Sequence, residues 1–212
     1  MKKLFVSDFD GTATALDFYK IVLNKIGDEG WTYVREHRKT GKVDYHFLNK
    51  IFGWHQLTDS EYESLIGTIE LDGHLRALLT YLSDQQIDFK FVSAGFDRYI
   101  QDVLKKEGYE HVDVITNPGF FEEGIMRMAP NVQSPFYSDV FGIDKGEVMR
   151  SFKKEYDRIY FAGDTEPDLS AALEADVIFA KGELIELVKQ AGKDCIEFET
   201  YEEVVDHLKR GV

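Results

Sequence analysis

Short apolar runs and longer amphipathic segments alternate along most of the chain. Apolar runs predict buried strands at residues 4–7, 89–93, 112–116, 158–162, 177–180 and 195–198. Apolar residues at helical spacing predict helices at 71–86, 96–108, 144–156, 166–175, 183–191 and 201–209, and residues 120–126 have the alternation and turn of a hairpin. Strands that alternate with helices indicate an α/β fold with a parallel sheet covered by helices on both faces.

The segment after the first strand has a different pattern of apolar residues. From about residue 17 to residue 68, apolar and aromatic residues recur at helical spacing, with breaks near Gly27–Gly30 and Gly41. This pattern predicts a small all-helical unit inserted into the α/β fold. We therefore divide the chain into a core of residues 1–14 and 72–212 and a helical insertion of residues 15–71.

Composition narrows the class of protein. Hydrophobic residues make up 43% and charged residues 30% of the 212 positions, which is typical of one soluble globular domain, or of one domain with a smaller insertion. Acidic residues outnumber basic ones by 39 to 25, and the net charge of −14 argues against nucleic acid or an anionic membrane surface as a partner.

Cysteine usage and the length of the apolar runs bear on the compartment. The single cysteine, Cys195, excludes an internal disulfide and a metal site built from cysteines. No apolar run approaches the ~20 residues that span a bilayer, and Lys2 and Lys3 are not followed by a signal-peptide core. We expect a cytoplasmic protein without a membrane or nucleic acid partner, and its oligomeric state stays open.

Polar residues gather where the predicted strands end. Ligands of open parallel sheets bind beyond the carboxyl ends of the strands, so residues there share one crevice. A lysine also begins the predicted helix at 144–156. The residues placed in this way are Asp8 and Asp10 after the first strand, Ser93, Ala94 and Gly95 after the second, Asp164 and Asp168 after the strand at 158–162, and Lys145.

These residue types indicate phosphoryl transfer. Several carboxylates in one cleft repel each other unless some are protonated or a hard divalent cation neutralises them, and Mg²⁺ suits carboxylates without histidine. Ser93, the neighbouring amides and the Lys145 ammonium are donors for a phosphate. One aspartate can attack phosphorus while a second transfers the proton, and Asp8 and Asp10 fit these roles.

Four motifs carry a resemblance to a known family. In order, they are DFDGT at residues 8–12, Ser93, Lys145 and GDTEPD at residues 163–168. They resemble the motifs of the haloacid dehalogenase superfamily of phosphatases, and the resemblance spans nearly the whole chain. The helical insertion is similar to the small cap of the phosphoserine-phosphatase-like branch, and within that branch the chain resembles the methionine-salvage phosphatases.

The resemblance implies a fold and a set of roles. It implies a Rossmann-like core, residues 15–71 as a cap that closes over the site, and a small phosphorylated metabolite as substrate. Asp8 would be the nucleophile and Asp10 the acid and base. The remaining roles would be Mg²⁺ binding by Asp8, Asp164 and the backbone carbonyl of Asp10, phosphoryl binding by Ser93, Ala94, Gly95 and Lys145, and support by Thr12 and Asp168.

Several alternatives stay open from the sequence. In the same branch an acidic residue soon after the first motif faces the substrate; Asp17 stands there, but it could also cap the next helix. The aromatic residues of the insertion and the cations Arg35, Arg38 and Lys42 leave open whether the substrate has an apolar or a second anionic part. A phosphomutase and a non-catalytic phosphate-binding protein are the rival functions.

Overall fold

A six-stranded parallel sheet forms the centre of the molecule. The computed structural model describes residues 1–211 except Thr40 and Lys42. The strand order is β10-β9-β8-β1-β2-β3, and every neighbouring pair is parallel. The predicted α/β class is therefore confirmed. The strands are β1 (Lys3–Ser7), β2 (Ile87–Phe96), β3 (Asp113–Asn117), β8 (Arg158–Gly163), β9 (Val177–Ala180) and β10 (Ile196–Glu197).

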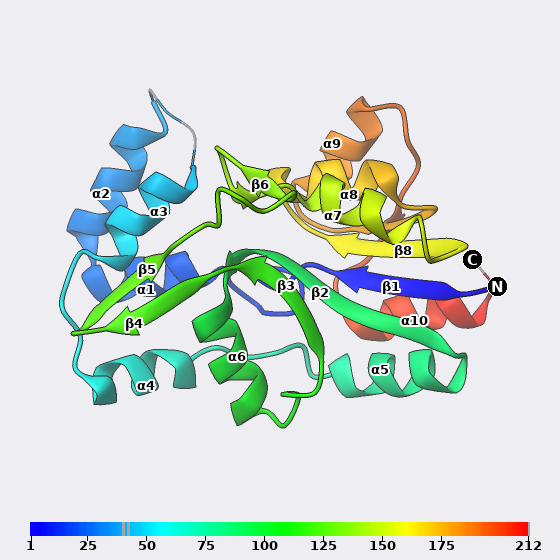
Figure 1. Ribbon diagram of the computed structural model, residues 1–212, viewed down its shortest axis with the longest axis horizontal. Coiled ribbons are helices and arrows are strands. Elements are labelled where there is room, and N and C mark those ends of the chain that lie inside the picture. Colours follow the sequence, from blue (N-terminus) through cyan, green and yellow to red (C-terminus); the bar gives the residue numbers. More distant parts are fainter. Residues whose placement is uncertain (40, 42, 212) are drawn as a thin grey trace.

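Helices cover both faces of this sheet. In Figure 1, α5 and α10 lie on one face, and α7, α8 and α9 lie on the other. None of the helices in the described part of the chain is long and apolar enough to cross a membrane. The helices outside the insertion are α5 (Leu75–Asp84), α6 (Asp97–Lys106), α7 (Lys145–Phe152), α8 (Leu169–Glu174), α9 (Leu184–Gln190) and α10 (Tyr201–Lys209).

The central strand shows why its sequence is apolar throughout. Leu4, Phe5 and Val6 of β1 are all fully buried. Because side chains alternate along a strand, Phe5 joins the cluster that includes residues of α5 and α10, whereas Leu4 and Val6 join the cluster that includes residues of α7 and α9. A strand buried on both faces positions its carboxyl end, and hence Asp8, rigidly.

The insertion contributes helices that lie at one end of the sheet (Figure 1). Its helices are α1 (Phe18–Ile26), α2 (Asp28–His37), α3 (Tyr45–Phe52) and α4 (Asp59–Gly67). Asp44 caps α3 through the amide of Phe47, and Thr58 and Glu61 form a capping box at α4. Two backbone segments join the insertion to the sheet and pair at Thr14 and Leu71. The assignment of residues 15–71 as a mobile cap remains a prediction.

Other small elements complete the chain. The predicted hairpin is confirmed as β4 (Gly119–Glu122) and β5 (Ile125–Met128). A second antiparallel pair, β6 (Tyr137–Ser138) and β7 (Gly142–Ile143), was not predicted, because two-residue strands leave no periodic pattern. A 3-10 turn, η1 (Glu166–Asp168), precedes α8, where the sequence predicted a single helix.

Two predicted boundaries were wrong, and one was confirmed, for identifiable reasons. The helix expected from residue 71 begins at Leu75, because Leu71 pairs with Thr14 instead. The break expected near Gly27–Gly30 is confirmed at Gly27, which has a φ of +86°, and α2 runs through Gly30. Strand β2 does not end at residue 93 but continues to Phe96, with a register shift against β3.

Candidate active site

The structure brings the charged residues of the motifs together at one edge of the sheet. Asp8 follows β1, Asp164 follows β8, and Lys145 is the first residue of α7. The Lys145 ammonium is buried and forms ion pairs with Asp8 and with Asp168, the latter at 2.6 Å from Nζ to Oδ1. Residues far apart in the sequence thus converge as the strand-end rule predicts.

Three carboxylates lie close enough to share a cation. One ligand oxygen from each of Asp8, Asp164 and Asp168 lies within 4.8 Å of the others, and all three residues are buried. Asp168 has other partners, since Oδ1 accepts from Lys145 and Oδ2 accepts from the amides of Asp164 (2.9 Å) and Thr165 (3.1 Å). Asp8 and Asp164 are therefore the carboxylates best placed to bind a metal ion.

The first motif packs directly against Asp164. The Thr12 hydroxyl donates to Asp164 Oδ1 at 2.9 Å. Gly11 has a φ of +79°, and a Cβ at this position would lie 2.4 Å from Asp164 Oδ2. The glycine of the DFDGT motif is thus required both by the backbone conformation and by the close approach of Asp164.

Asp10 lies apart from the three clustered carboxylates. Its Oδ1 accepts from the amide of Phe18 at 2.9 Å, its Oδ2 accepts from the Tyr99 hydroxyl, and Ser93 Oγ lies 3.5 Å from Oδ2. The Asp10 side chain is not part of the group of possible metal ligands. We expected Asp10 to bind the metal through its backbone carbonyl, and that role remains a prediction.

The predicted phosphate-binding segment is part of β2. Ser93 is buried, and its Oγ accepts from the amide of Gly95 at 3.0 Å. The Asn117 side-chain amide donates to the carbonyls of Ala94 (3.0 Å) and Phe141 (2.9 Å) and so fixes this segment against the loop before α7. These contacts place Ser93 beside Asp10.

Two buried polar residues of this region escaped the sequence analysis. Asn117 ends β3, and the same strand-end rule would have found it. Tyr99 lies within α6 at a position that reads as part of its apolar face, so no sequence signal distinguished it.

Burial dominates the electrostatics of the site. Burial and the charge of Asp17 raise the pKa of Asp10 to about 6, against hydrogen bonds from Tyr99 and Phe18 that lower it. Burial and the charges of Asp168 and Asp17 raise the pKa of Asp164 to about 7. Burial and Asp168 also raise the pKa of Asp8, which the Lys145 ammonium only partly offsets. A bound cation would offset the free-energy cost of ionising these buried carboxylates, so the oxygen donors fit a hard divalent ion.

Lys145 and Tyr99 keep their protons. Burial lowers the pKa of Lys145, but the charges of Asp168 and Asp8 outweigh it and raise the pKa above its ordinary value. Burial and the neighbouring Asp10 raise the pKa of Tyr99. The site therefore offers one fixed positive charge and one fixed neutral donor.

Asp17 faces the same region from the insertion. Its side chain makes no cap contact with α1 and instead forms an ion pair with Lys20. Asp17 thus occupies the N-cap position of α1 without a side-chain cap, and the substrate-contact role remains a prediction. Arg38 donates to the Tyr19 hydroxyl at 3.4 Å, whereas Lys42 lies outside the described residues.

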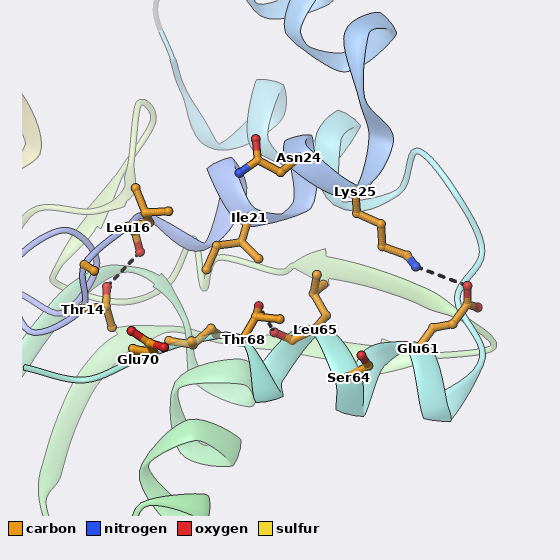
Figure 2. A pocket seen from close by; sticks show the side chains of 12 residues that line it. Thr14, Leu16, Ile21, Asn24, Lys25, Glu61, Ser64, Leu65, Thr68 and Glu70 are labelled. Atoms are coloured by element: carbon orange, nitrogen blue, oxygen red, sulfur yellow. Dashed lines mark hydrogen bonds and ion pairs between the residues drawn. The ribbon is translucent and has the colours of Figure 1, made fainter.

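A hollow of about 590 Å³ lies elsewhere, between α1 and α4 (Figure 2). The ion pair between Lys25 and Glu61 crosses one end of it at 3.3 Å. Leu16, Ile21 and Leu65 supply much of its apolar lining. The predicted site residues are not among its lining residues, so we place the chemistry at the carboxylate cluster and not in this hollow.

The chain is similar in sequence to bacterial phosphatases. It is 30% identical over 134 residues to the 2-hydroxy-3-keto-5-methylthiopentenyl-1-phosphate phosphatase of Exiguobacterium sibiricum, which is 63% of this chain and 61% of that protein. It is 27% identical over 210 residues to the Bacillus pumilus protein of the same name, with 95% and 89% of the two chains covered. No family model matches the chain.

Solved structures with the same fold include phosphoserine phosphatases. The apo form of one has a TM-score of 0.72 at 19% identity and covers 97% of this chain and 98% of that chain. A HAD family hydrolase of Salmonella enterica has a TM-score of 0.72 at 14% identity, with 96% and 69% covered. Relatives in sequence and neighbours in fold agree with the motifs, and the chain is similar to phosphatases of the haloacid dehalogenase superfamily and, in fold, to phosphoserine phosphatases.

Proposed function

We propose that this protein is a Mg²⁺-dependent phosphatase that hydrolyses the phosphate monoester of a small metabolite through an aspartyl-phosphate on Asp8. The observation that carries the proposal is the buried contact of Asp8 with the Lys145 ammonium, next to Asp164 and two residues before Asp10. A nucleophile, a fixed cation, a metal-binding carboxylate and an acid/base group stand within one site.

The residues present suit Mg²⁺. Asp8 and Asp164 would hold the ion. Asp168 would keep these ligands in place, because it accepts from Lys145 and from the amide of Asp164. Thr12 would help by donating to Asp164 Oδ1. When bound, Mg²⁺ would offset the charge on the phosphoryl oxygens. The raised pKa values of the buried Asp8 and Asp164 carboxylates mean that their ionised forms are destabilised, and a bound cation would stabilise those forms.

The first half-reaction would use both carboxylates of the first motif. An oxygen of Asp8 attacks phosphorus and forms the Asp8–phosphorus bond, while the bond from phosphorus to the leaving oxygen breaks. Asp10 gives its proton to that oxygen, and the product alcohol leaves. Lys145, together with Ser93, would stabilise the negative oxygens of the transferred group.

The second half-reaction would reverse the role of Asp10. Asp10 takes a proton from water, the water oxygen attacks phosphorus, and the Asp8–phosphorus bond breaks. Inorganic phosphate leaves and the Asp8 carboxylate is restored. A pKa of Asp10 near 6 suits a group that must give and take a proton in turn.

The relatives suggest where to look for the substrate. Their name specifies 2-hydroxy-3-keto-5-methylthiopentenyl-1-phosphate, and we propose a small monoester of this kind. The test is phosphate release from a panel that contains this compound, phosphoserine, sugar phosphates and 4-nitrophenyl phosphate, with Mg²⁺ and with EDTA. We expect metal-dependent release with a strong preference for one compound. Folded protein that releases no phosphate from any member in Mg²⁺ would overturn the proposal.

A further inference from the structure

The carboxylate of Asp10 is held by donors from two different elements. Oδ1 accepts from the amide of Phe18, the first residue of α1, and Oδ2 accepts from the hydroxyl of Tyr99 in α6. Each carboxylate oxygen has two lone pairs, so both contacts leave room for the proton that Asp10 must carry. The two donors fix where that proton is presented.

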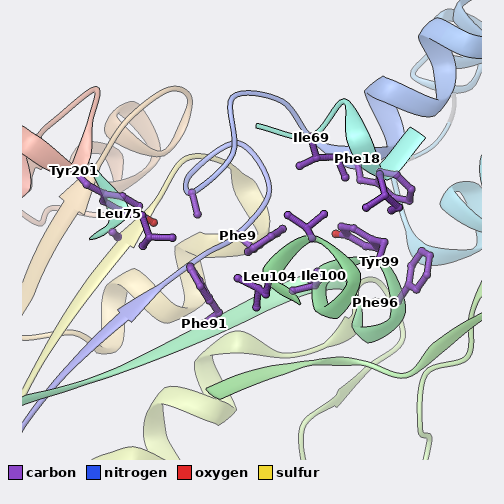
Figure 3. Packing of buried hydrophobic residues seen from close by; sticks show 14 of the residues in the cluster. Phe9, Phe18, Ile69, Leu75, Phe91, Phe96, Tyr99, Ile100, Leu104 and Tyr201 are labelled. Carbon is purple, nitrogen blue, oxygen red and sulfur yellow. The ribbon is translucent and has the colours of Figure 1, made fainter. Parts of the chain in front are cut away.

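Packing leaves the Tyr99 ring no freedom to swing away. Its ring stacks on Phe18 with centroids 4.2 Å apart and an interplanar angle of 17°, and it meets Phe96 edge-on at 4.8 Å. Figure 3 shows Tyr99 among these buried rings. Tyr99 is only 1% exposed, so its hydroxyl is aimed by the hydrophobic cluster.

The chain also leaves space for this hydroxyl. A Cβ on Gly95 would lie 1.9 Å from the Tyr99 oxygen and 3.0 Å from Asp10 Oδ2. A glycine at position 95 is therefore needed for the contact, because a larger residue would displace the tyrosine oxygen from the Asp10 carboxylate.

We infer that Tyr99 is a positioning residue that orients the Asp10 carboxylate for proton transfer and, through its stack on Phe18, ties that orientation to the first helix of the insertion. The tyrosine keeps its own proton throughout, and the transferred proton moves between Asp10 and the leaving oxygen or water. This inference rests on the proposed function, because it assigns Tyr99 to the step that Asp10 performs.

The test uses Tyr99→Phe, which keeps the ring and removes the hydroxyl. Its matched control is Tyr62→Phe. Tyr62 is also buried, stacks on Phe121 at 4.2 Å and donates to the carboxylate of Asp102 at 2.7 Å, so the control removes the same type of contact away from Asp10. Thermal unfolding of both variants reports any loss of fold.

The readout is kcat/KM on two esters that differ in their need for a proton. An alkoxide leaving group must be protonated, whereas 4-nitrophenolate leaves without a proton. We expect Tyr99→Phe to lower kcat/KM about tenfold or more on an alkyl phosphate and much less on 4-nitrophenyl phosphate. Tyr62→Phe should leave both values within about twofold. Equal losses on the two esters, no loss on either, or failure of Tyr99→Phe to fold would overturn the inference.

A second measurement separates this inference from the proposed function. If Tyr99 acts through Asp10, then Tyr99→Phe should have little further effect on kcat/KM in an Asp10→Asn background. Full activity of Asp10→Asn would contradict the proposed function itself. A large loss for Asp10→Asn, combined with additive effects in the double variant, would overturn only the role of Tyr99.

Discussion

Two carboxylates of one short loop are held in opposite ways. The Asp8 side of the site, made of Asp8, Lys145, Asp164 and Asp168, is charged, with a buried ammonium between two carboxylates. Asp10, two residues later, is met by a backbone amide and a tyrosine hydroxyl, both of them neutral donors. Neighbours in sequence thus lie in different chemical environments.

The difference shows how one loop can supply two functions. Under the proposed function, the Lys145 ammonium partly offsets the raised pKa of Asp8, and a bound Mg²⁺ would offset it further. Burial raises the pKa of Asp10 to about 6, which would let that group gain and lose a proton near neutral pH. Residues two apart on a strand would point to the same side, so the different environments of the two carboxylates arise in the turn that follows β1. Substitutions on the Asp8 side should therefore abolish phosphatase activity or lower the stability of the fold.

The largest effect is expected from Asp8→Asn. Asparagine cannot form the acyl-phosphate, so turnover of the best substrate should fall by at least about a thousandfold. The fold should persist, because the amide oxygen can still accept from Lys145. Steady-state phosphate release and circular dichroism measure the two outcomes. Activity near the wild-type value would rule out Asp8 as the nucleophile.

Lys145→Met should be the next most damaging change. It leaves the buried carboxylates of Asp8 and Asp168 without their ammonium, and breaking a buried pair from one side costs about 3 kcal/mol or more. Urea unfolding measures the free-energy change. The control is Lys153→Met, whose exposed pair with Glu174 should contribute less than about 1 kcal/mol. Equal losses for the two variants would contradict the buried-pair account.

Gly11→Ala should disturb the metal-binding carboxylate. Its φ of +79° makes alanine strained, and the new Cβ would collide with Asp164. Gly108→Ala is a matched control, because Gly108 has the same φ of +79° and no atom within 4 Å of the added Cβ. Both should lose about 1–2 kcal/mol of stability from backbone strain. Only Gly11→Ala should also lose Mg²⁺-dependent activity; loss in both variants would show that strain alone matters.

The smallest predicted effect is a pH-dependent stabilisation by Mg²⁺. Burial raises the pKa of Asp164 from 3.8 to about 7, so the metal-free fold favours protonated Asp164, and the stability present below pH 3.8 is lost as the pH rises through about 7. Mg²⁺ should replace that proton and raise the thermal midpoint more at about pH 8 than at about pH 5.5. An equal rise at both pH values would contradict a metal site at Asp164.

Strand ends and motif order were enough to predict much of this site. Asp8, Asp164 and Asp168 were found because parallel strands bring their carboxyl ends to one edge, whereas Lys145, the first residue of a helix, was found through the order of the motifs. The contacts of Asp10 were not predictable in the same way. Tyr99 reaches it through the packing of aromatic rings from α1 and α6, and that packing depends on three-dimensional fit, not on spacing along the chain.

The fold shows the same division. Element type followed from hydrophobic periodicity along the sheet, whereas the start of α5 depended on a pairing between Thr14 and Leu71 across the two connecting segments. Such non-local contacts override local pattern.

Trapping the covalent intermediate tests the central claim most directly. The wild-type protein would be mixed with its best substrate and Mg²⁺, quenched in acid, digested and analysed by mass spectrometry. We predict one phosphoryl group on Asp8, in a bond that hydroxylamine cleaves, and no such adduct in Asp8→Asn. A phosphoryl group on another residue, or rapid turnover without any adduct on Asp8, would contradict the account.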